Sequence, residues 1–292
     1  MAHVLVVGGA GGVGLAVVEK LLARGDSVSI SVLNDAEEAV ARSRVPGIAS
    51  VLRLDLSDAA SVGPALTKAL GSQPAVQAII VCAAIAPLGP LETTPLNVIR
   101  RTLEVNCVSD IAIFQAGLPA LRETGGRFIF VSSMAGFASM PFIGAYSASK
   151  FALEGAADAM RREAAPQGVS LSLVEPGGIK TPMVENQLVE VRERLATLGA
   201  EERARYGYLY QAFDVMARKS YEEDSSTAGQ VADVIITALD ADKPQARYLA
   251  GADAEQMKML ASQDDATVDA AFEGIFAQAS AAAQSLESAE NA

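Results

Sequence analysis

Short runs of apolar, often β-branched residues alternate along this chain with longer segments of helical pattern, and this alternation limits the possible folds more than any other feature. Strands separated by helical segments pair in parallel, with the crossover helices covering both faces of the sheet. The pattern therefore predicts an α/β fold with a doubly wound parallel sheet of about seven strands. We expect these strands at residues 3–7, 28–32, 50–54, 78–82, 127–131 and 169–174, with a seventh at 247–250.

Helical patterns are expected between the strands at about residues 13–24, 58–70, 95–121, 145–164 and 227–240. Residues 183–224 interrupt the alternation, because Glu, Arg, Tyr and Leu are mixed there without a strand pattern, which predicts a helical insertion. Residues 252–292 are expected to form a helical extension and tail. Within it, the Ala/Ser/Glu-rich stretch 279–292 is expected to bury little.

The composition excludes several classes of protein. The chain has 292 residues, is 50% hydrophobic and 20% charged, and carries a net charge of −12, a profile typical of a folded domain and unfavourable for nucleic acid as a partner. Cys82 and Cys107 lie in apolar contexts and are expected to be reduced, and no secretory signal is visible, so we expect a cytoplasmic protein. The longest apolar run, residues 78–86, is too short to span a membrane.

A glycine-rich turn, G-G-A-G-G-V-G at residues 8–14, joins the first strand to the first helix. Glycines let the backbone approach a pyrophosphate closely, and the free N–H groups at the start of the helix favour its negative charge. The turn therefore predicts a dinucleotide site. Its candidate contacts are Gly8, Gly11, Gly12, Val13 and Gly14.

Tyr146 and Lys150 are four residues apart in a helical segment, so their Cβ atoms are expected to lie about 5–6 Å apart on one face. Hydride transfer to a carbonyl requires a proton donor at the oxygen, and a free phenol ionises only near pH 10. A nearby ammonium favours the phenolate and supplies most of the required shift. We therefore expect Tyr146 to be the acid/base and Lys150 to tune it.

Two more polar residues join this set. Ser133 follows the fifth strand, where ligands of open parallel sheets bind, and is expected to polarise the carbonyl, with Ser132 as a competing candidate. Asn106 lies in an otherwise apolar helical segment, where it either serves the site or satisfies a buried carbonyl. Other chemistry lacks its residues: His3 is the only histidine, which argues against a Ser-His-Asp hydrolase, and no metal-ligating cluster is expected.

Together these residues resemble the short-chain dehydrogenase/reductase family over residues 3–250. The similarity rests on Gly8, Gly12, Gly14, Asp55, Asn106, Ser133, Tyr146, Lys150 and P-G-G-I-K-T at 176–181. The motifs G-P-L-E at 89–92, S-K-F-A-L-E-G at 149–155 and K-P-Q-A-R-Y at 243–248 resemble its hydroxysteroid and retinol dehydrogenase branch. The resemblance implies a single Rossmann-type domain over residues 1–251, an NAD(P)-dependent oxidoreductase, and a homodimer or homotetramer.

The resemblance also implies residue roles. Lys150 holds the nicotinamide ribose, and Asn106 holds a water in a proton relay to Lys150. Further cofactor contacts are Asn34, Asp55, Leu56, Ala83, Tyr146, Pro176, Gly177, Ile179 and Thr181. Asp55 either accepts a hydrogen bond from the adenine amino group or is an ordinary helix cap.

The stretch after the second strand bears on the choice of cofactor. It reads Val32-Leu33-Asn34-Asp35, without an arginine to clamp a 2′-phosphate, and Asp35 would repel one. We expect a preference for NAD over NADP, with NADP not excluded, because Arg42 or Arg44 could reverse it.

Three departures from the family pattern keep alternatives open. Cys82-Ala83-Ala84-Ile85 replaces the usual Asn-Asn-Ala-Gly, and Val7 replaces a threonine. Gly8-x-x-Gly11-x-x-Gly14 is also the spacing of the extended branch. A catalytically silent nucleotide-binding regulatory protein, or an epimerase or dehydratase of the extended branch, are therefore the alternatives.

The insertion at residues 183–224 bears on the substrate. Its apolar residues are expected to cover a hydrophobic pocket as a lid, or equally to pack on the edge of the sheet. They are Met183, Leu188, Val189, Leu195, Leu198, Tyr206, Tyr208, Leu209, Tyr210, Phe213 and Met216. A lid of this kind predicts a hydrophobic secondary alcohol or ketone.

Overall fold

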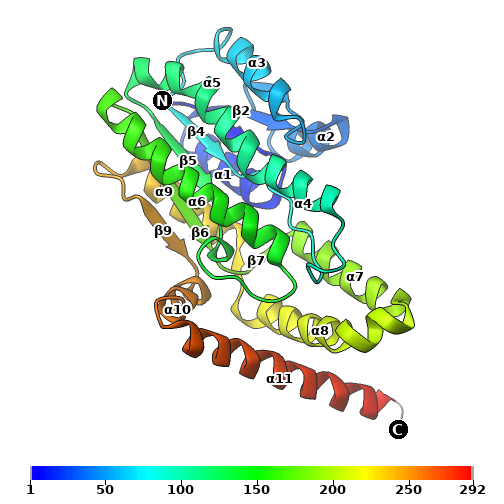
Figure 1. Ribbon diagram of the computed structural model, residues 1–292. Coiled ribbons are helices and arrows are strands. Elements are labelled where there is room, and N and C mark those ends of the chain that lie inside the picture. Colours follow the sequence, from blue (N-terminus) through cyan, green and yellow to red (C-terminus); the bar gives the residue numbers. More distant parts are fainter. Residues whose placement is uncertain (1, 291–292) are drawn as a thin grey trace.

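The computed structural model describes residues 2–290, with side chains described through residue 285. Seven parallel strands form one sheet in the order β3-β2-β1-β4-β5-β6-β9, which confirms the predicted sheet and its seventh strand (Figure 1). The strands are β1 (His3–Val7), β2 (Ser27–Val32), β3 (Ser50–Arg53), β4 (Ala78–Val81), β5 (Arg127–Val131), β6 (Ser170–Pro176) and β9 (Arg247–Ala250).

Helices cover both faces of this sheet, so its strands are apolar on both sides. One face packs against α1 (Gly12–Ala23), α2 (Asp35–Arg44) and α9 (Ala228–Asp240). The other packs against α3 (Ala59–Leu70), α5 (Ser109–Thr124) and α6 (Gly144–Ala164). In β1, Val4 and Val6 pack against the first group while Leu5 and Val7 pack against the second, and all four are buried.

The helix predicted at 95–121 is interrupted. It comprises α4 (Leu96–Leu103), a π-helical turn η1 (Glu104–Val108) and α5. Single-turn π-helices inside α-helices frequently occur at functional sites, and this one contains Asn106. Short 3₁₀ turns, η2 (Met134–Gly136) and η3 (Ala165–Gln167), follow β5 and α6.

The insertion is helical, as the sequence predicts. A two-residue pairing of β7 (Ile179–Lys180) with β8 (Ser226–Thr227) closes its base. Between them lie α7 (Pro182–Thr197), α8 (Ala200–Lys219) and a π-helical turn η4 (Ser220–Asp224).

The described side chains of residues 279–285 bury little, as predicted, because only Ala279 and Ala283 among them are buried. The chain continues after β9 as α10 (Ala252–Leu260) and α11 (Asp265–Glu290), and α11 lies along α8 (Figure 1). Its buried side chains recur every three or four residues, at Phe272, Phe276, Ala279 and Ala283. The alanines form part of a contact face, because small side chains at this spacing let two helices approach closely. Residues 291–292 lie outside the described residues.

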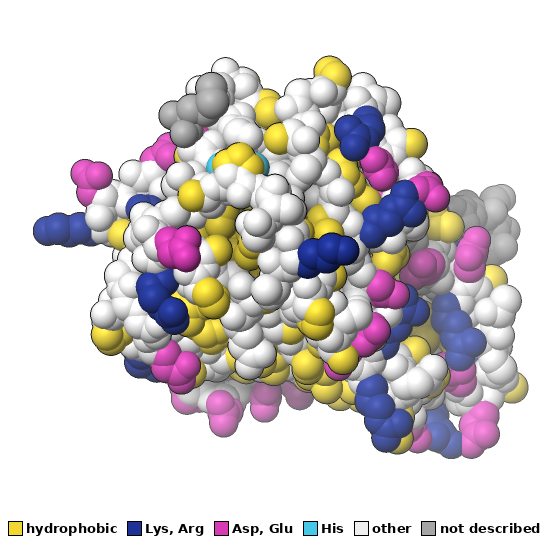
Figure 2. Space-filling view, turned by 90° about the horizontal axis from the view of Figure 1, so that it is seen from above, with side chains coloured by type: hydrophobic (Ala, Val, Ile, Leu, Met, Phe, Trp, Pro, Cys, Tyr) yellow, Lys and Arg dark blue, Asp and Glu magenta, His cyan; other side chains and the backbone are white. Residues whose placement is uncertain are grey.

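The surface shows no single field of charge on the face opposite the insertion, where Lys/Arg and Asp/Glu side chains are interspersed (Figure 2). Within residues 2–290, no helix is both long enough and apolar enough to cross a membrane. The division of the chain at residue 251 stays a prediction.

Candidate active site

The predicted catalytic residues meet at the carboxyl end of the sheet. Ser133 follows β5 and begins η2, Tyr146 and Lys150 lie in the first turns of α6, and Asn106 lies in η1. Both η1 and η2 contact α6, which brings three separate parts of the chain to one place. Open parallel sheets bind their ligands at this end of the strands.

Lys150 is buried beside the Tyr146 ring. Its side chain is 1% exposed, and Nζ donates a hydrogen bond of 2.9 Å to the Val131 carbonyl at the end of β5. Nζ lies 5.9 Å from the centroid of the Tyr146 ring. The structure thus places a buried ammonium beside a half-buried phenol.

Ser133 and Ser132 both lie at the end of β5 with a hydroxyl proton to donate. Ser133 Oγ accepts a hydrogen bond of 3.1 Å from the Ala135 N–H, which leaves its hydroxyl proton free. Ser132 Oγ is buried without a hydrogen-bond partner, and a Cβ on Gly136 would lie 2.9 Å from it and 3.0 Å from Glu154 Cγ. The choice of Ser133 as the carbonyl-polarising residue stays a prediction.

Asn106 ties the active-site elements together. Its Oδ1 accepts from the Ile85 N–H at 2.9 Å, and its Nδ2 donates to the Ile85 carbonyl at 2.7 Å and to Ser149 Oγ at 2.9 Å. Ser149 Oγ in turn donates to the Tyr146 carbonyl at 2.7 Å. Asn106 thus anchors the backbone of the unusual Cys82-Ala83-Ala84-Ile85 stretch. Its role in a proton relay stays a prediction.

The glycine turn packs against two of the other predicted cofactor contacts. A Cβ on Gly8, whose φ is +77°, would lie 2.8 Å from Ala83, and a Cβ on Gly12 would lie 2.8 Å from Thr181 Cγ2. A Cβ on Gly14 would lie 2.1 Å from the Gly8 carbonyl oxygen, so this turn requires glycine. The start of α1 has no side-chain cap, which suits an anion. Val13, partly buried, packs against the core on the α1 face of the sheet.

A dinucleotide also suits the turn after β6. Thr181 Oγ1 is buried without a hydrogen-bond partner in the protein, as expected of a group that a ligand satisfies. Pro176 ends β6, and Ile179 lies in β7. The predicted contacts on this turn therefore lie at the carboxyl end of the strands, as the glycine turn does.

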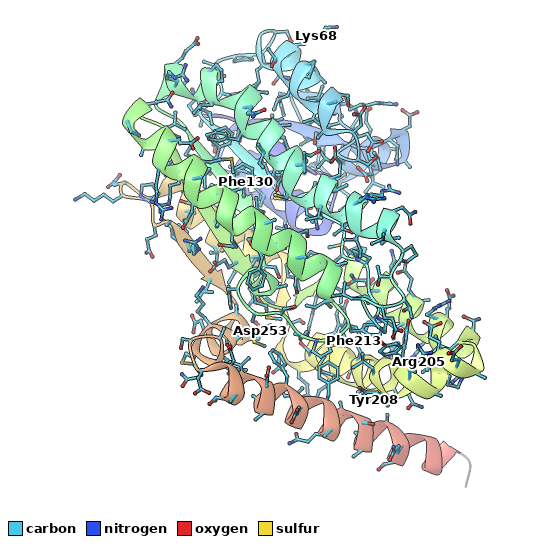
Figure 3. The ribbon with its side chains drawn as sticks, viewed as in Figure 1. Lys68, Phe130, Arg205, Tyr208, Phe213 and Asp253 are labelled. Carbon is cyan, nitrogen blue, oxygen red and sulfur yellow. The ribbon has the colours of Figure 1, made fainter. Side chains whose placement is uncertain are left out.

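Asp253, which the sequence did not single out, holds this turn in place. Its Oδ2 accepts a hydrogen bond of 2.6 Å from the Gly178 N–H, and a Cβ on Gly177 would lie 2.1 Å from both carboxylate oxygens. Figure 3 shows Asp253 on α10 and Phe213 on α8 at the same end of the sheet. The contact joins residues 75 positions apart, so no local pattern signals it.

The other predicted cofactor contacts lie at the ends of β2 and β3. Asp55 Oδ1 accepts from Ser57 N at 2.9 Å and Oγ at 2.7 Å, and these bonds lower the pKa of Asp55, which stays ionised. Asp55 therefore forms a turn and does not cap α3, whose N-cap is Asp58. Leu56 is buried, and its carbonyl accepts from Ser109 Oγ at 2.7 Å.

At the end of β2, the Asn34 side chain caps α2 by accepting from the Glu37 N–H at 3.0 Å. The Glu37 carboxylate accepts from the Leu33 N–H at 2.8 Å, which places a negative charge where β2 ends. Sequence reasoning missed Glu37, although a glutamate three residues after a cap residue is the usual pattern of a capped helix start.

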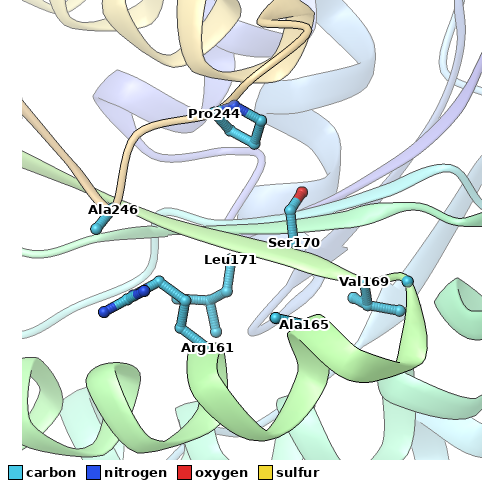
Figure 4. A pocket seen from close by; sticks show the side chains of 8 residues that line it. Arg161, Ala165, Val169, Ser170, Leu171, Pro244 and Ala246 are labelled. Carbon is cyan, nitrogen blue, oxygen red and sulfur yellow. The ribbon is translucent and has the colours of Figure 1, made fainter.

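A separate cavity of about 370 Å³ lies at the opposite end of the sheet, where the strands begin (Figure 4). It is bounded by the amino ends of β6 and β9 and by the end of α6, so it is not part of this site. The residues that line it are Arg161, Ala165, Gly168, Val169, Ser170, Leu171, Pro244 and Ala246. Among residues 2–290, no group of three or more His, Cys, Asp or Glu side chains is placed to hold a metal ion.

Comparisons with known proteins agree with this geometry. The short chain dehydrogenase family profile matches residues 2–191. Human 17-beta-hydroxysteroid dehydrogenase type 1 is 34% identical over 213 residues, which cover 73% of this chain and 63% of that protein. The 3-amino-tetrahydro-pyrrolizinone reductase of Xenorhabdus hominickii is 30% identical over 256 residues, which cover 86% of this chain and 87% of that protein.

The solved structures support the fold. A short chain dehydrogenase from Burkholderia cenocepacia J2315, crystallised in complex with NADP, superposes with a TM-score of 0.71 at 22% identity and covers 93% of this chain and 97% of that one. With the glycine turn, the uncapped start of α1 and the Tyr146–Lys150 pair at one edge of the sheet, these matches establish that the chain belongs to the short-chain dehydrogenase family of NAD(P)-dependent oxidoreductases.

Proposed function

We propose that the protein interconverts a hydrophobic secondary alcohol and its ketone, with Tyr146 as the acid/base. The observation that carries this proposal is the buried Lys150 ammonium, which lies 5.9 Å from the Tyr146 ring and bonds to the Val131 carbonyl at the end of β5. A catalytically silent regulatory protein would not need a buried ammonium beside a phenol. Burial of a charged ammonium is costly without a function or partner.

Each side chain has a distinct task. In the direction of reduction, Tyr146 Oη donates its proton to the carbonyl oxygen while the Ser133 hydroxyl donates a hydrogen bond to the same oxygen. In oxidation, Tyr146 takes the proton back from the alcohol. Lys150 favours the phenolate in both directions, and the nicotinamide, when bound, supplies or accepts the hydride.

We propose a preference for NAD over NADP, supported by the ion pairs around the end of β2. The two arginines that could receive a 2′-phosphate are engaged elsewhere, because Arg42 pairs with Glu38 at 2.8 Å and Arg44 pairs with Glu19 at 3.3 Å. Glu37 adds a negative charge at the same place. Binding titrations of NADH and NADPH test the proposal, and tighter binding of NADPH would contradict it.

The insertion supports a hydrophobic substrate. Phe142, four residues before Tyr146, has a φ of +82° and stacks on Phe213 and against the edge of Tyr210, each with ring centroids 4.6 Å apart. A bulky residue in the left-handed region is costly and typically marks a functional site. Phe276 of α11 packs on the same cluster, so α11 holds the insertion in place. The similarity to a hydroxysteroid dehydrogenase supports the same substrate class.

The test is a panel of alcohols and ketones, assayed with both cofactors by nicotinamide absorbance. We expect turnover of bulky hydrophobic secondary alcohols or their ketones. Turnover confined to small hydrophilic sugars would contradict the role of the insertion as a substrate lid.

We also propose a homodimer formed through α4, α5 and α6. Large apolar side chains are exposed at Leu96 of α4, Val108 at the end of η1 and Phe151 of α6, at 65%, 43% and 46% of their surface. A light-scattering mass equal to one chain would contradict the dimer.

The free thiols of Cys82 and Cys107 support the proposal that the protein works in the cytoplasm.

A further inference from the structure

Asp110 is a buried carboxyl that the proposed chemistry leaves without a role. It lies in the first turn of α5, is 1% exposed, and its Oδ1 has no hydrogen-bond partner. Aspartates are almost never fully buried unless they are paired, so a carboxyl oxygen in this condition requires an explanation.

Asp110 lies in a part of the fold that contacts the helix of the proposed acid/base pair. It lies about one helical turn after Asn106, on the continuous helix of η1 and α5. Asn106 of η1 bonds to Ser149, which directly precedes Lys150, and both η1 and α5 contact α6. The charge of Lys150 acts on the Asp110 carboxyl.

The other titratable groups of this cluster are thiols. Cys82 lies at the end of β4, and Cys107 lies in η1. Burial raises the pKa of both thiols, that of Cys82 to about 12, and both feel the charges of Asp110 and Lys150. Since both thiols are uncharged at neutral pH, Asp110 is the acidic member of the cluster whose ionisation lies closest to neutral pH.

We propose that Asp110 is a positioning residue for the acid/base chemistry: when ionised, its carboxylate offsets the charge of Lys150 and limits the action of that ammonium on Tyr146. This inference rests on the proposed roles of Tyr146 and Lys150. It adds a residue of this chain, outside the family motifs, to the control of the reaction.

The sign of the effect follows from the ionisation of Asp110. Burial raises its pKa to about 8, although the charge of Lys150 acts in the opposite direction. Below that pH the carboxyl is neutral, and Lys150 acts on the phenol undiminished. Above it, the carboxylate opposes Lys150, so the phenol keeps its proton to a higher pH. Ketone reduction, which needs the protonated phenol, therefore extends further into alkaline conditions.

The test is the pH dependence of kcat/KM for ketone reduction. Asp110→Asn removes the charge with little change in size, and activity should be lost about one pH unit earlier on the alkaline side. A nearby charge inside a protein typically shifts a pKa by about one unit or more. Asp110→Thr, a second neutral variant, should show the same shift.

Glu175→Gln is the matched control. Glu175 is also buried with a raised pKa, but its neighbouring charges are Glu154, Lys258 and Arg247, and not Lys150. Its variant should keep the wild-type profile. An alkaline limb at the wild-type pH in the Asp110 variants would overturn the inference, whatever their melting temperatures, because a purely structural carboxyl changes stability and not this ionisation. If the proposed function itself were wrong, Tyr146→Phe would keep its turnover.

Discussion

Replacing Lys150 with methionine should lower kcat and change the pH dependence of the reaction, because it removes the ammonium that the proposed function assigns to tuning Tyr146. Nζ lies 5.9 Å from the Tyr146 ring centroid and donates a hydrogen bond of 2.9 Å to the Val131 carbonyl. General acid–base catalysis typically contributes about 10²–10⁴-fold, so kcat should fall by roughly tenfold or more.

Alcohol oxidation should slow as well, because the same hydroxyl takes up the proton in that direction. Cofactor affinity should fall as well if Lys150 holds the nicotinamide ribose. The assay is steady-state kinetics in both directions from pH 6 to 10, in roughly one-unit steps, beside a melting curve.

Lys258→Met is the control for this experiment. Its Nζ lies 3.9 Å from the ring centroid of Phe137, which has no hydroxyl to ionise, so its pH profile should not move. A folded Lys150→Met enzyme with both limbs at their wild-type positions would refute the electrostatic role of Lys150.

Three further predictions test the parts of the fold that support the site. Asp253→Ala removes a charge-assisted hydrogen bond to the turn after β6 and should raise the KM for the cofactor by about tenfold or more. Glu255→Ala, at an exposed position on the same helix, should leave this KM unchanged. Equal cofactor KM values for the two variants would contradict the role of Asp253. Phe276→Ala should lower the free energy of unfolding by about 3–5 kcal/mol, against under about 0.5 kcal/mol for Ile275→Ala, as measured by denaturant titration. Burial and a neighbouring carboxylate raise the pKa of Glu175 from 4.5 to about 7, so its contribution to stability is complete below pH 4.5 and is lost as the pH rises through about 7. Glu175→Gln should flatten this decline in melting temperature, and a wild-type melting temperature that rises from pH 5 to 8 would argue against it.

The sheet could be predicted because each strand is a local pattern of apolar residues. The misses have physical reasons. Helix α2 was not predicted, because its only buried residue is Ala41 and its first turn is acidic, so it shows no apolar stripe. The packing of α11 along α8 was not predicted, because these helices meet only in the folded chain and no local pattern names the partner.

The site divides in the same way. Tyr146 and Lys150 could be found because helical spacing is local, and the structure places the Lys150 ammonium beside the Tyr146 ring as expected. Asp110 and Asp253 could not be found, because burial and partners distant in the sequence give them their significance. The choice between Ser132 and Ser133 stays a prediction, because both hydroxyls follow β5.

The central claim is that the Tyr146 hydroxyl is the acid/base, and the most direct test is kcat of Tyr146→Phe beside its cofactor affinity. The ring is kept and only the titrating hydroxyl is lost, so cofactor binding and melting temperature should stay near the wild-type values. General acid–base catalysis typically contributes about 10²–10⁴-fold, so kcat should fall by at least that factor. A folded Tyr146→Phe enzyme that keeps more than roughly a tenth of the wild-type kcat would contradict the claim.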